Sequence, residues 1–219
     1  MKHAMTLMLS LLPATLNADQ LTCADETIQV VDAGEYSERM CSVASAAAEE
    51  LRACNLTLDQ NVTIRLSRNL GEVCVGLYHC GEGQIEISHP DVLAERIEDS
   101  SLFSALDVMT YFDSIIFHEL VHAAFDSVPC PFAACPATSE YLAYGLQLRA
   151  LSEEDREKMG LGTVPGEKVS RDAINAVMVY WAPDRFAVKA WSHLMQRPDT
   201  CDYVKLIADG AIRFDYEHP

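Results

Sequence analysis

The sequence predicts an α+β fold in which a small mixed sheet comes first and helices follow. Segments that alternate apolar and polar residues, as half-buried strands do, are concentrated before Pro90. After Pro90 the apolar residues recur every three or four positions, which is the spacing of amphipathic helices. The 219 residues suffice for one domain with a substantial core.

The first half is expected to form four strands with one helix across them. The strands are predicted, in chain order, at Thr27–Asp32, Val62–Leu66, Val73–Tyr78 and Gly83–Ser88. The helix is expected over Ser37–Cys54, where Met40, Val43, Ala47 and Leu51 share one face.

The longest predicted helix, Leu106–Ser127, is apolar on two opposite sides. Ile115 and Phe125 mark one side, and Ile116 and Leu120 mark the other. Such a helix is buried, so we expect it between the sheet and a helical lobe. Further helices are predicted at Asp91–Ile97, Thr138–Leu151, Arg171–Trp181, Asp184–Gln196 and Cys201–Ala208.

The N-terminal residues have the features of a secretory signal peptide. Lys2 is followed by an apolar run, Ala4–Leu12, and Ala18 closes a plausible cleavage site. We therefore predict a signal peptide at residues 1–18 and a single domain at 19–219, with the sheet and longest helix in 19–127 and a helical part in 128–219. No later stretch is long enough to span a membrane, and a secreted or periplasmic location is expected.

The eight cysteines support export. An even number in an exported chain favours disulfides over thiolate metal sites. Cys130 and Cys135 bracket a proline-containing loop, and we predict that they pair. Cys41 and Cys54 share one predicted helix, and a rise of about 1.5 Å per residue separates them too far for a bridge.

The charge balance bears on the partners. The chain has 33 acidic against 16 basic residues, a formal net charge of −17. A surface of that sign repels nucleic acid and anionic membranes, so neither is expected as a partner.

The centre of the longest helix carries the pattern His-Glu-x-x-His. His118 and His122 are four residues apart, so a helix presents both imidazoles on one face to a single ion. Glu119, beside the first histidine, can deprotonate a metal-activated water without being a ligand. The alternative is a helix with two ordinary histidines, which more often would carry charge at the intervening positions.

A catalytic zinc site needs a third protein ligand. Glu140 is the nearest suitable residue, at the start of the next predicted helix. Ala143 and Gly145 are small and would let that helix approach the histidine helix. Two imidazoles and one carboxylate suit zinc better than harder metals, so Zn2+ is the expected cofactor. The alternative to a metal ligand is that Glu140 is a helix-start carboxylate stabilised by the helix dipole.

These residues resemble the zincin metallopeptidases in their gluzincin arrangement. That family has His-Glu-x-x-His on one helix and Glu-x-x-Ala or Glu-x-x-Ser on the next, matched here by His118, Glu119, His122, Glu140 and Ala143. The resemblance covers the region from about Gly83 to Leu151. It implies a zincin-like fold with an edge strand over the active-site helix.

The resemblance also implies roles for neighbouring segments. The strand Gly83–Ser88 would be the sheet edge that pairs with an extended peptide substrate. Where the family has an Asp that supports the first histidine, this chain has Tyr144, so Tyr144, Asp113 or Asp126 would take that part.

A developing oxyanion needs a donor near the metal. Tyr141, Tyr144, Tyr180 and His193 are candidates, with Tyr144 preferred because it lies one turn after Glu140. We interpret His193 as a surface histidine, and Trp181 and Trp191 as core residues.

The sequence thus predicts an exported zinc metallopeptidase. Zinc on His118, His122 and Glu140 would activate water, Glu119 would act as general base, and the substrate would be a peptide or protein. The alternative is a catalytically silent zinc-binding protein that acts as a binding or structural module. A non-peptide hydrolase with the same metal site would differ only in its cleft.

Overall fold

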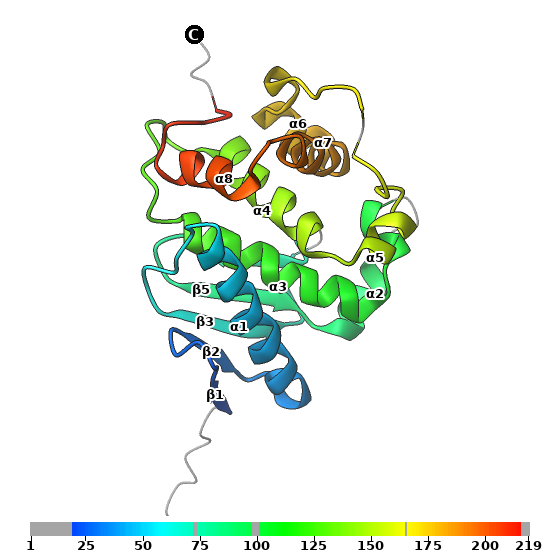
Figure 1. Cartoon of the computed structure of the whole chain (residues 1–219). Coiled ribbons are helices and arrows are strands. Elements are labelled where there is room, and N and C mark those ends of the chain that lie inside the picture. The colour runs from blue at the N-terminus through cyan, green and yellow to red at the C-terminus, as the bar shows by residue number, and fades with distance from the viewer. Residues whose placement is uncertain (1–18, 72–73, 98–100, 165, 216–219) are drawn as a thin grey trace, which may run out of the picture.

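The computed structural model describes residues 19–71, 74–97, 101–164 and 166–215. The predicted signal peptide, residues 1–18, lies outside the described residues. The described chain is an α+β protein, with a five-stranded mixed sheet near its beginning and helices after it (Figure 1). The fold class and the order of its two parts are as predicted.

The sheet has the strand order β1-β2-β3-β5-β4. The strands β2, β3 and β5 run parallel, whereas β1 and β4 pair antiparallel at the two edges. The first edge strand was not predicted, because its three residues are too few to show alternation. The bounds are β1 (Gln20–Thr22), β2 (Ile28–Val31), β3 (Val62–Ser67), β4 (Gly76–His79) and β5 (Gln84–Ser88).

The predicted edge strand Gly83–Ser88 is in fact an interior strand. Its structured part, β5, pairs with β3 on one side and with β4 on the other. A tight turn folds β4 back over the free side of β5, and Gly81 and Gly83 adopt the positive φ angles that this turn requires. The edge next to the longest helix is therefore β4. The alternation in β5 shows that it is a strand but does not show whether it lies at the edge of the sheet.

Two helices cover one face of the sheet. α1 (Ser37–Ala53) packs on β2, α3 (Val108–Phe125) packs on β4 and β5, and the two helices also contact each other. The strand residues that face them, such as Ile64 and Ile85, are fully buried. Buried and more exposed residues therefore alternate along the strands, as the apolar and polar residues of the sequence do.

Further helices lie on the side of α3 away from the sheet. α4 (Pro136–Ala150) packs on α3, and α7 (Pro183–Met195) packs on α4 (Figure 1). The helix α3 is thus buried on two sides, as its sequence predicts. The shorter helices are α2 (Pro90–Arg96), α5 (Glu153–Lys158), α6 (Ala176–Trp181) and α8 (Thr200–Ala208).

The predicted helix Arg171–Trp181 is divided. A 3-10 turn, Arg171–Ala173, is followed by the six-residue helix α6. The break falls at Asn175, which has extended backbone and accepts a hydrogen bond from the N–H of Met178. Asn175 is therefore an N-cap, and it starts a new helix rather than continuing the old one.

Three disulfides tie the chain together. They are Cys23–Cys41, Cys54–Cys201 and the predicted pair Cys130–Cys135. Among the described residues, Cys74 and Cys80 form no disulfide. Within the same residues, no helix combines the length and the apolar character that a membrane crossing needs.

Candidate metal centre

The helix α3 presents both histidines of the motif. Asp107 caps its start by accepting hydrogen bonds from the N–H groups of Met109 and Thr110. One turn apart on this helix, His118 and His122 point the same way, with their Nε2 atoms 3.1 Å apart. Two nitrogens so close in a buried setting form one half of a coordination site.

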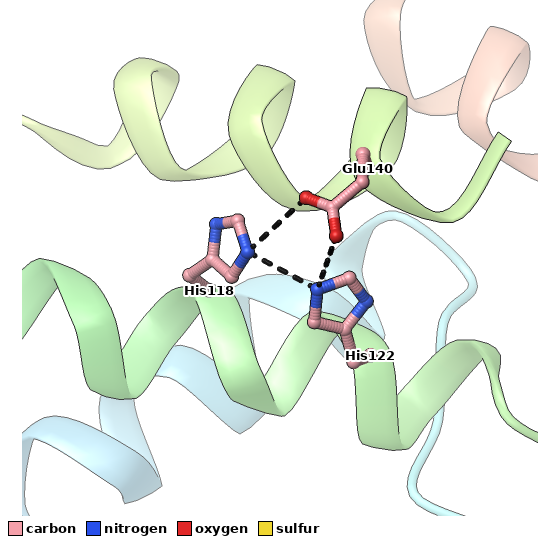
Figure 2. Close-up of side chains that lie close together, drawn as sticks. All are labelled: His118, His122 and Glu140. Atoms are coloured by element: carbon pink, nitrogen blue, oxygen red, sulfur yellow. Dashed lines mark hydrogen bonds and ion pairs between the residues drawn. The ribbon is translucent and has the colours of Figure 1, made fainter. Parts of the chain in front are cut away.

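Glu140 supplies the other half from α4. Its Oε2 lies 3.5 Å from Nε2 of His118, and its Oε1 lies 3.5 Å from Nε2 of His122. Figure 2 shows the three side chains converging from the two helices. The sequence prediction that Glu140 reaches the histidines is therefore correct as geometry.

Two small residues of α4, Ala143 and Gly145, lie in different packing environments. Ala143 is fully buried in the core. Gly145, however, faces α7, because a Cβ added to it would lie 3.0 Å from the side chain of Leu194. The expectation that Gly145 brings α4 close to α3 is wrong; it permits the close approach of α7.

The His118, His122 and Glu140 group, hereafter the HHE group, can hold a metal ion. The ligand atoms of the three side chains all lie within 4.8 Å of one another. Glu140 Oε2 is buried and lacks a hydrogen-bond partner among the described residues, which is costly unless a cation satisfies it. Two imidazole nitrogens and a carboxylate oxygen form a donor set that fits a zinc-type ion.

A chain of hydrogen bonds sets the tautomer of His118. The Gln147 amide group donates to Ser114 Oγ, and that hydroxyl donates to the Tyr111 carbonyl. The amide oxygen of Gln147 therefore faces His118 and accepts from Nδ1 at 3.0 Å. The Nε2 lone pair of His118 is left free for an ion.

His122 is supported separately. Its Nδ1 lies 2.8 Å from the hydroxyl of Ser139, the residue before Glu140. The predicted supports for the first histidine, Tyr144, Asp113 and Asp126, are wrong, because Gln147 accepts from its Nδ1. Asp113 pairs instead with Arg39, and Asp126 accepts a hydrogen bond from the Tyr78 hydroxyl.

Glu119 lies beside the HHE group beneath the edge strand. It is buried, and burial raises the pKa of its carboxyl to about 7, although the charge of His118 opposes this rise. A Cβ on Gly76 of β4 would overlap Glu119 Oε1 and would lie 2.6 Å from Ile115 Cγ2. Only glycine at position 76 leaves room for this carboxylate.

Tyr144 also lies where the sequence places it. Its ring meets the His118 ring edge-on, with centroids 4.7 Å apart. Burial raises the pKa of the phenol, so it remains a protonated donor at neutral pH. Its hydroxyl makes no hydrogen bond to any described residue and therefore remains free to donate to a ligand.

The other oxyanion candidates lie elsewhere. Tyr141 is buried in the core, where its hydroxyl bonds to Nδ1 of His193 at 2.9 Å. His193 is thus a buried residue and not the surface histidine that was expected, and burial lowers its pKa to about 4. Tyr180 is 73% exposed on α6 and does not line the cleft described next.

The HHE group opens into a large cleft of about 1170 Å³. β4, α3, α4 and the beginning of α7 contribute to its walls. Asp126, at the end of α3, fixes the end of β4 beside it by accepting from the Tyr78 hydroxyl and from the N–H of Gly81. The edge strand therefore has a defined position next to Glu119.

Sequence reasoning missed four residues of this arrangement. Ser114 precedes His118 by one helical turn, and Gln147 follows Glu140 by two turns, so helical spacing could have found both. Ser139 adjoins Glu140 in sequence. Gly76 carries no such signal, because its role depends on how β4 crosses α3.

The fold and the HHE group define an α+β protein with a candidate metal centre between two helices. The chain belongs to a family of unknown function, DUF6639, whose sequence profile matches residues 28–217. The matched range contains the whole HHE group and four of the five strands. No curated protein and no solved structure matches the chain.

Proposed function

We propose that this protein is an exported zinc-dependent metallopeptidase of the gluzincin type. The observation that carries the proposal is the HHE group, with its ligand atoms within 4.8 Å, beside a buried general-base candidate at position 119. The three disulfides support export, since such bonds persist in oxidising compartments.

The residues around the HHE group leave its ligand atoms available to bind an ion. Gln147 fixes the free Nε2 of His118, and Glu140 has a buried oxygen that lacks a hydrogen-bond partner among the described residues. A zinc ion held there supplies Lewis-acid chemistry, which polarises a carbonyl and lowers the pKa of water. The chain's own residues then orient the substrate and move the proton.

Glu119 is the base in this proposal. Its carboxylate would take a proton from the attacking water and pass it to the leaving amine. Its buried position beside the HHE group suits it to both transfers. Tyr144, with a free and protonated hydroxyl beside His118, would donate a hydrogen bond to the oxyanion that develops on the substrate.

The edge strand β4 would hold the substrate. Among the described strands β4 pairs only with β5, so no strand covers its other side. The backbone N–H of Tyr78 donates to the Glu119 carboxylate, which ties this edge to the proposed base. Val75, Leu77 and Tyr78 line the cleft, which places this free edge beside the HHE group. An extended peptide added to the edge would form main-chain hydrogen bonds next to the reacting centre.

The rival proposal is a catalytically silent zinc protein. A site that only pins α3 to α4 has no use for a buried carboxylate at position 119, and burial of that group costs free energy. The large open cleft likewise favours a substrate site over a closed structural one.

The test compares two Glu→Gln variants for cleavage of unfolded casein. Glu119→Gln should retain zinc and lose turnover by at least about 10³-fold, since a positioned base and its electrostatics are removed. Glu95→Gln, an exposed position on α2, is the matched control and should cleave as the wild type does. Zinc-loaded wild type without turnover would support the silent protein, and equal turnover in Glu119→Gln would exclude Glu119 as the base.

A further inference from the structure

The helix α6 exposes large apolar side chains to solvent. Val177, Tyr180 and Trp181 are 59%, 73% and 85% exposed and lie at i, i+3 and i+4, hence on one face. Met178 and Val179 face the other way and pack on the core. The expectation that Trp181 is a core residue is therefore wrong. We call Val177, Tyr180 and Trp181 the α6 patch.

The α6 patch is concentrated, whereas other exposed apolar residues are scattered. Among the described residues, the remaining large hydrophobics with comparable exposure are Leu77, Val164 and Leu206, at 39%, 38% and 44%. Each of these stands on a different element or loop. Scattered apolar residues are normal on protein surfaces, but a cluster with a tryptophan more often marks a binding site.

The α6 patch is continuous with the wall of the cleft. The chain passes from Trp181 directly into residues 182–185, all of which line the cleft that contains the HHE group. The same cleft is lined by Leu77 of the edge strand β4. The α6 patch therefore begins at the residue next to the cleft wall, within reach of a polypeptide that occupies the cleft.

The chemistry of α6 selects an apolar partner. Residues 174–183 contain no charged side chain, in a chain with a formal net charge of −17. The nearest charged residues along the chain, Asp172 and Asp184, lie outside α6, so the α6 patch itself offers no counter-charge. Trp and Tyr offer large contact area with little loss of conformational freedom, and they dominate binding energy at interfaces.

We propose that the α6 patch binds large apolar side chains of an extended or unfolded polypeptide whose neighbouring segment occupies the metal cleft. The inference rests on the proposed peptidase function and names its substrate class: unfolded chains rich in aromatic and aliphatic residues. Recognition away from the reacting bond raises the affinity for such chains.

The size and charge of the α6 patch disfavour two other occupants. A second copy of the chain would need about 800 Å² per partner for a stable dimer, whereas aromatic side chains bury about 150–250 Å² each. An anionic membrane would be repelled by the acidic chain. A polypeptide that also fills the cleft gains further contact area there and need not carry the negative charge of a membrane.

The experiment compares Tyr180→Ala/Trp181→Ala with Leu206→Ala. The control removes an exposed apolar side chain on α8, outside the cleft. With carboxymethylated casein as substrate, the double variant should raise KM about 10-fold or more and leave kcat nearly unchanged, because α6 touches no reacting atom. Leu206→Ala should leave both constants as in the wild type.

A binding readout separates this inference from the proposed function. On the inactive Glu119→Gln background, the anisotropy of fluorescein-labelled carboxymethylated casein should rise on binding, and the Kd from this titration should rise about 10-fold or more in the double variant. A Gly/Ser-rich polypeptide should produce neither effect.

The outcomes are distinct. If the wild type never cleaves casein but Kd depends on α6, the peptidase proposal fails and the polypeptide-binding inference stands. If casein is cleaved with unchanged KM and Kd in the double variant, the inference is overturned. The inference would also be overturned if the double variant kept the casein Kd of the wild type but lost an ability of the wild type to bind neutral phosphatidylcholine vesicles. Loss of a wild-type dimer in sedimentation, again with the casein Kd unchanged, would overturn it as well.

Discussion

The helices α3 and α6 violate ordinary burial rules in opposite directions. α3 buries His118 and Glu119 and half-buries His122, whereas α6 leaves a tryptophan 85% exposed. Buried ionisable groups and exposed aromatic clusters both cost free energy, so each persists where another interaction compensates. We propose that an ion compensates in α3 and that a partner polypeptide compensates in α6.

The two tryptophans give the largest expected contrast. Trp191 is 4% exposed on α7, so Trp191→Ala should lower the free energy of unfolding by about 3–5 kcal/mol. Trp181→Ala should change it by less than about 0.5 kcal/mol, because an exposed side chain loses little on truncation. Urea unfolding of both variants measures the difference. Comparable losses in the two would show that Trp181 is a packed residue.

Gly76→Ala should damage activity strongly while the fold survives. The added methyl would displace Glu119 and Ile115, and a displacement of about 1 Å at a reacting group can cost about 10²-fold in kcat/KM. Gly166→Ala is the control, because its Cβ would meet no described atom within 4 Å. The kcat/KM of both variants on casein measures the effect. Full activity in Gly76→Ala would contradict the close packing of β4 over Glu119.

Gln147→Leu should weaken zinc binding about 10–100-fold, because His118 loses the acceptor that orients its ring. Gln147→Glu restores an acceptor oxygen and should recover part of the affinity. Competition with a zinc-chelating dye measures both constants. An affinity equal to that of the wild type in Gln147→Leu would show that the relay through Ser114 does not orient the ligand.

For His193 we expect a smaller effect, a dependence of the free energy of unfolding on pH. Its folded-state pKa of about 4 lies below the ordinary value of 6.5, so between these values the unfolded chain binds more protons than the folded chain. Stability should therefore fall as pH drops from 6.5 to 4, by about 1–2 kcal/mol once solvent relaxation is allowed for. His193→Asn, measured by urea unfolding across this range with a chelator present, should reduce the slope. An identical slope in the variant would mean that His193 is protonated in the fold.

Much of the fold could be predicted because local patterns determine it. Alternation located β2, β3 and β5, and the two-sided apolar pattern of α3 identified it as the buried central helix. Strand order could not be predicted in this way, since the alternation within a strand does not show which strands lie beside it. The error over the edge strand follows directly from that.

The metal group was predictable for a related reason. His118 and His122 are fixed by helical spacing, and Glu140 follows at the start of the next helix. Gln147 and Ser114 follow the same spacing but are common polar residues, so only their contacts reveal their role. Trp181 was misjudged because an apolar position on a helix does not show which side another helix will cover.

The most direct test of the account is the zinc content of the purified protein after dialysis, measured by mass spectrometry beside three variants. We expect equimolar zinc in the wild type and in Glu119→Gln, and loss of most zinc in His122→Ala and Glu140→Ala, with circular dichroism showing that each is folded. A folded wild type that binds no zinc, or ligand variants that keep it, would contradict the account.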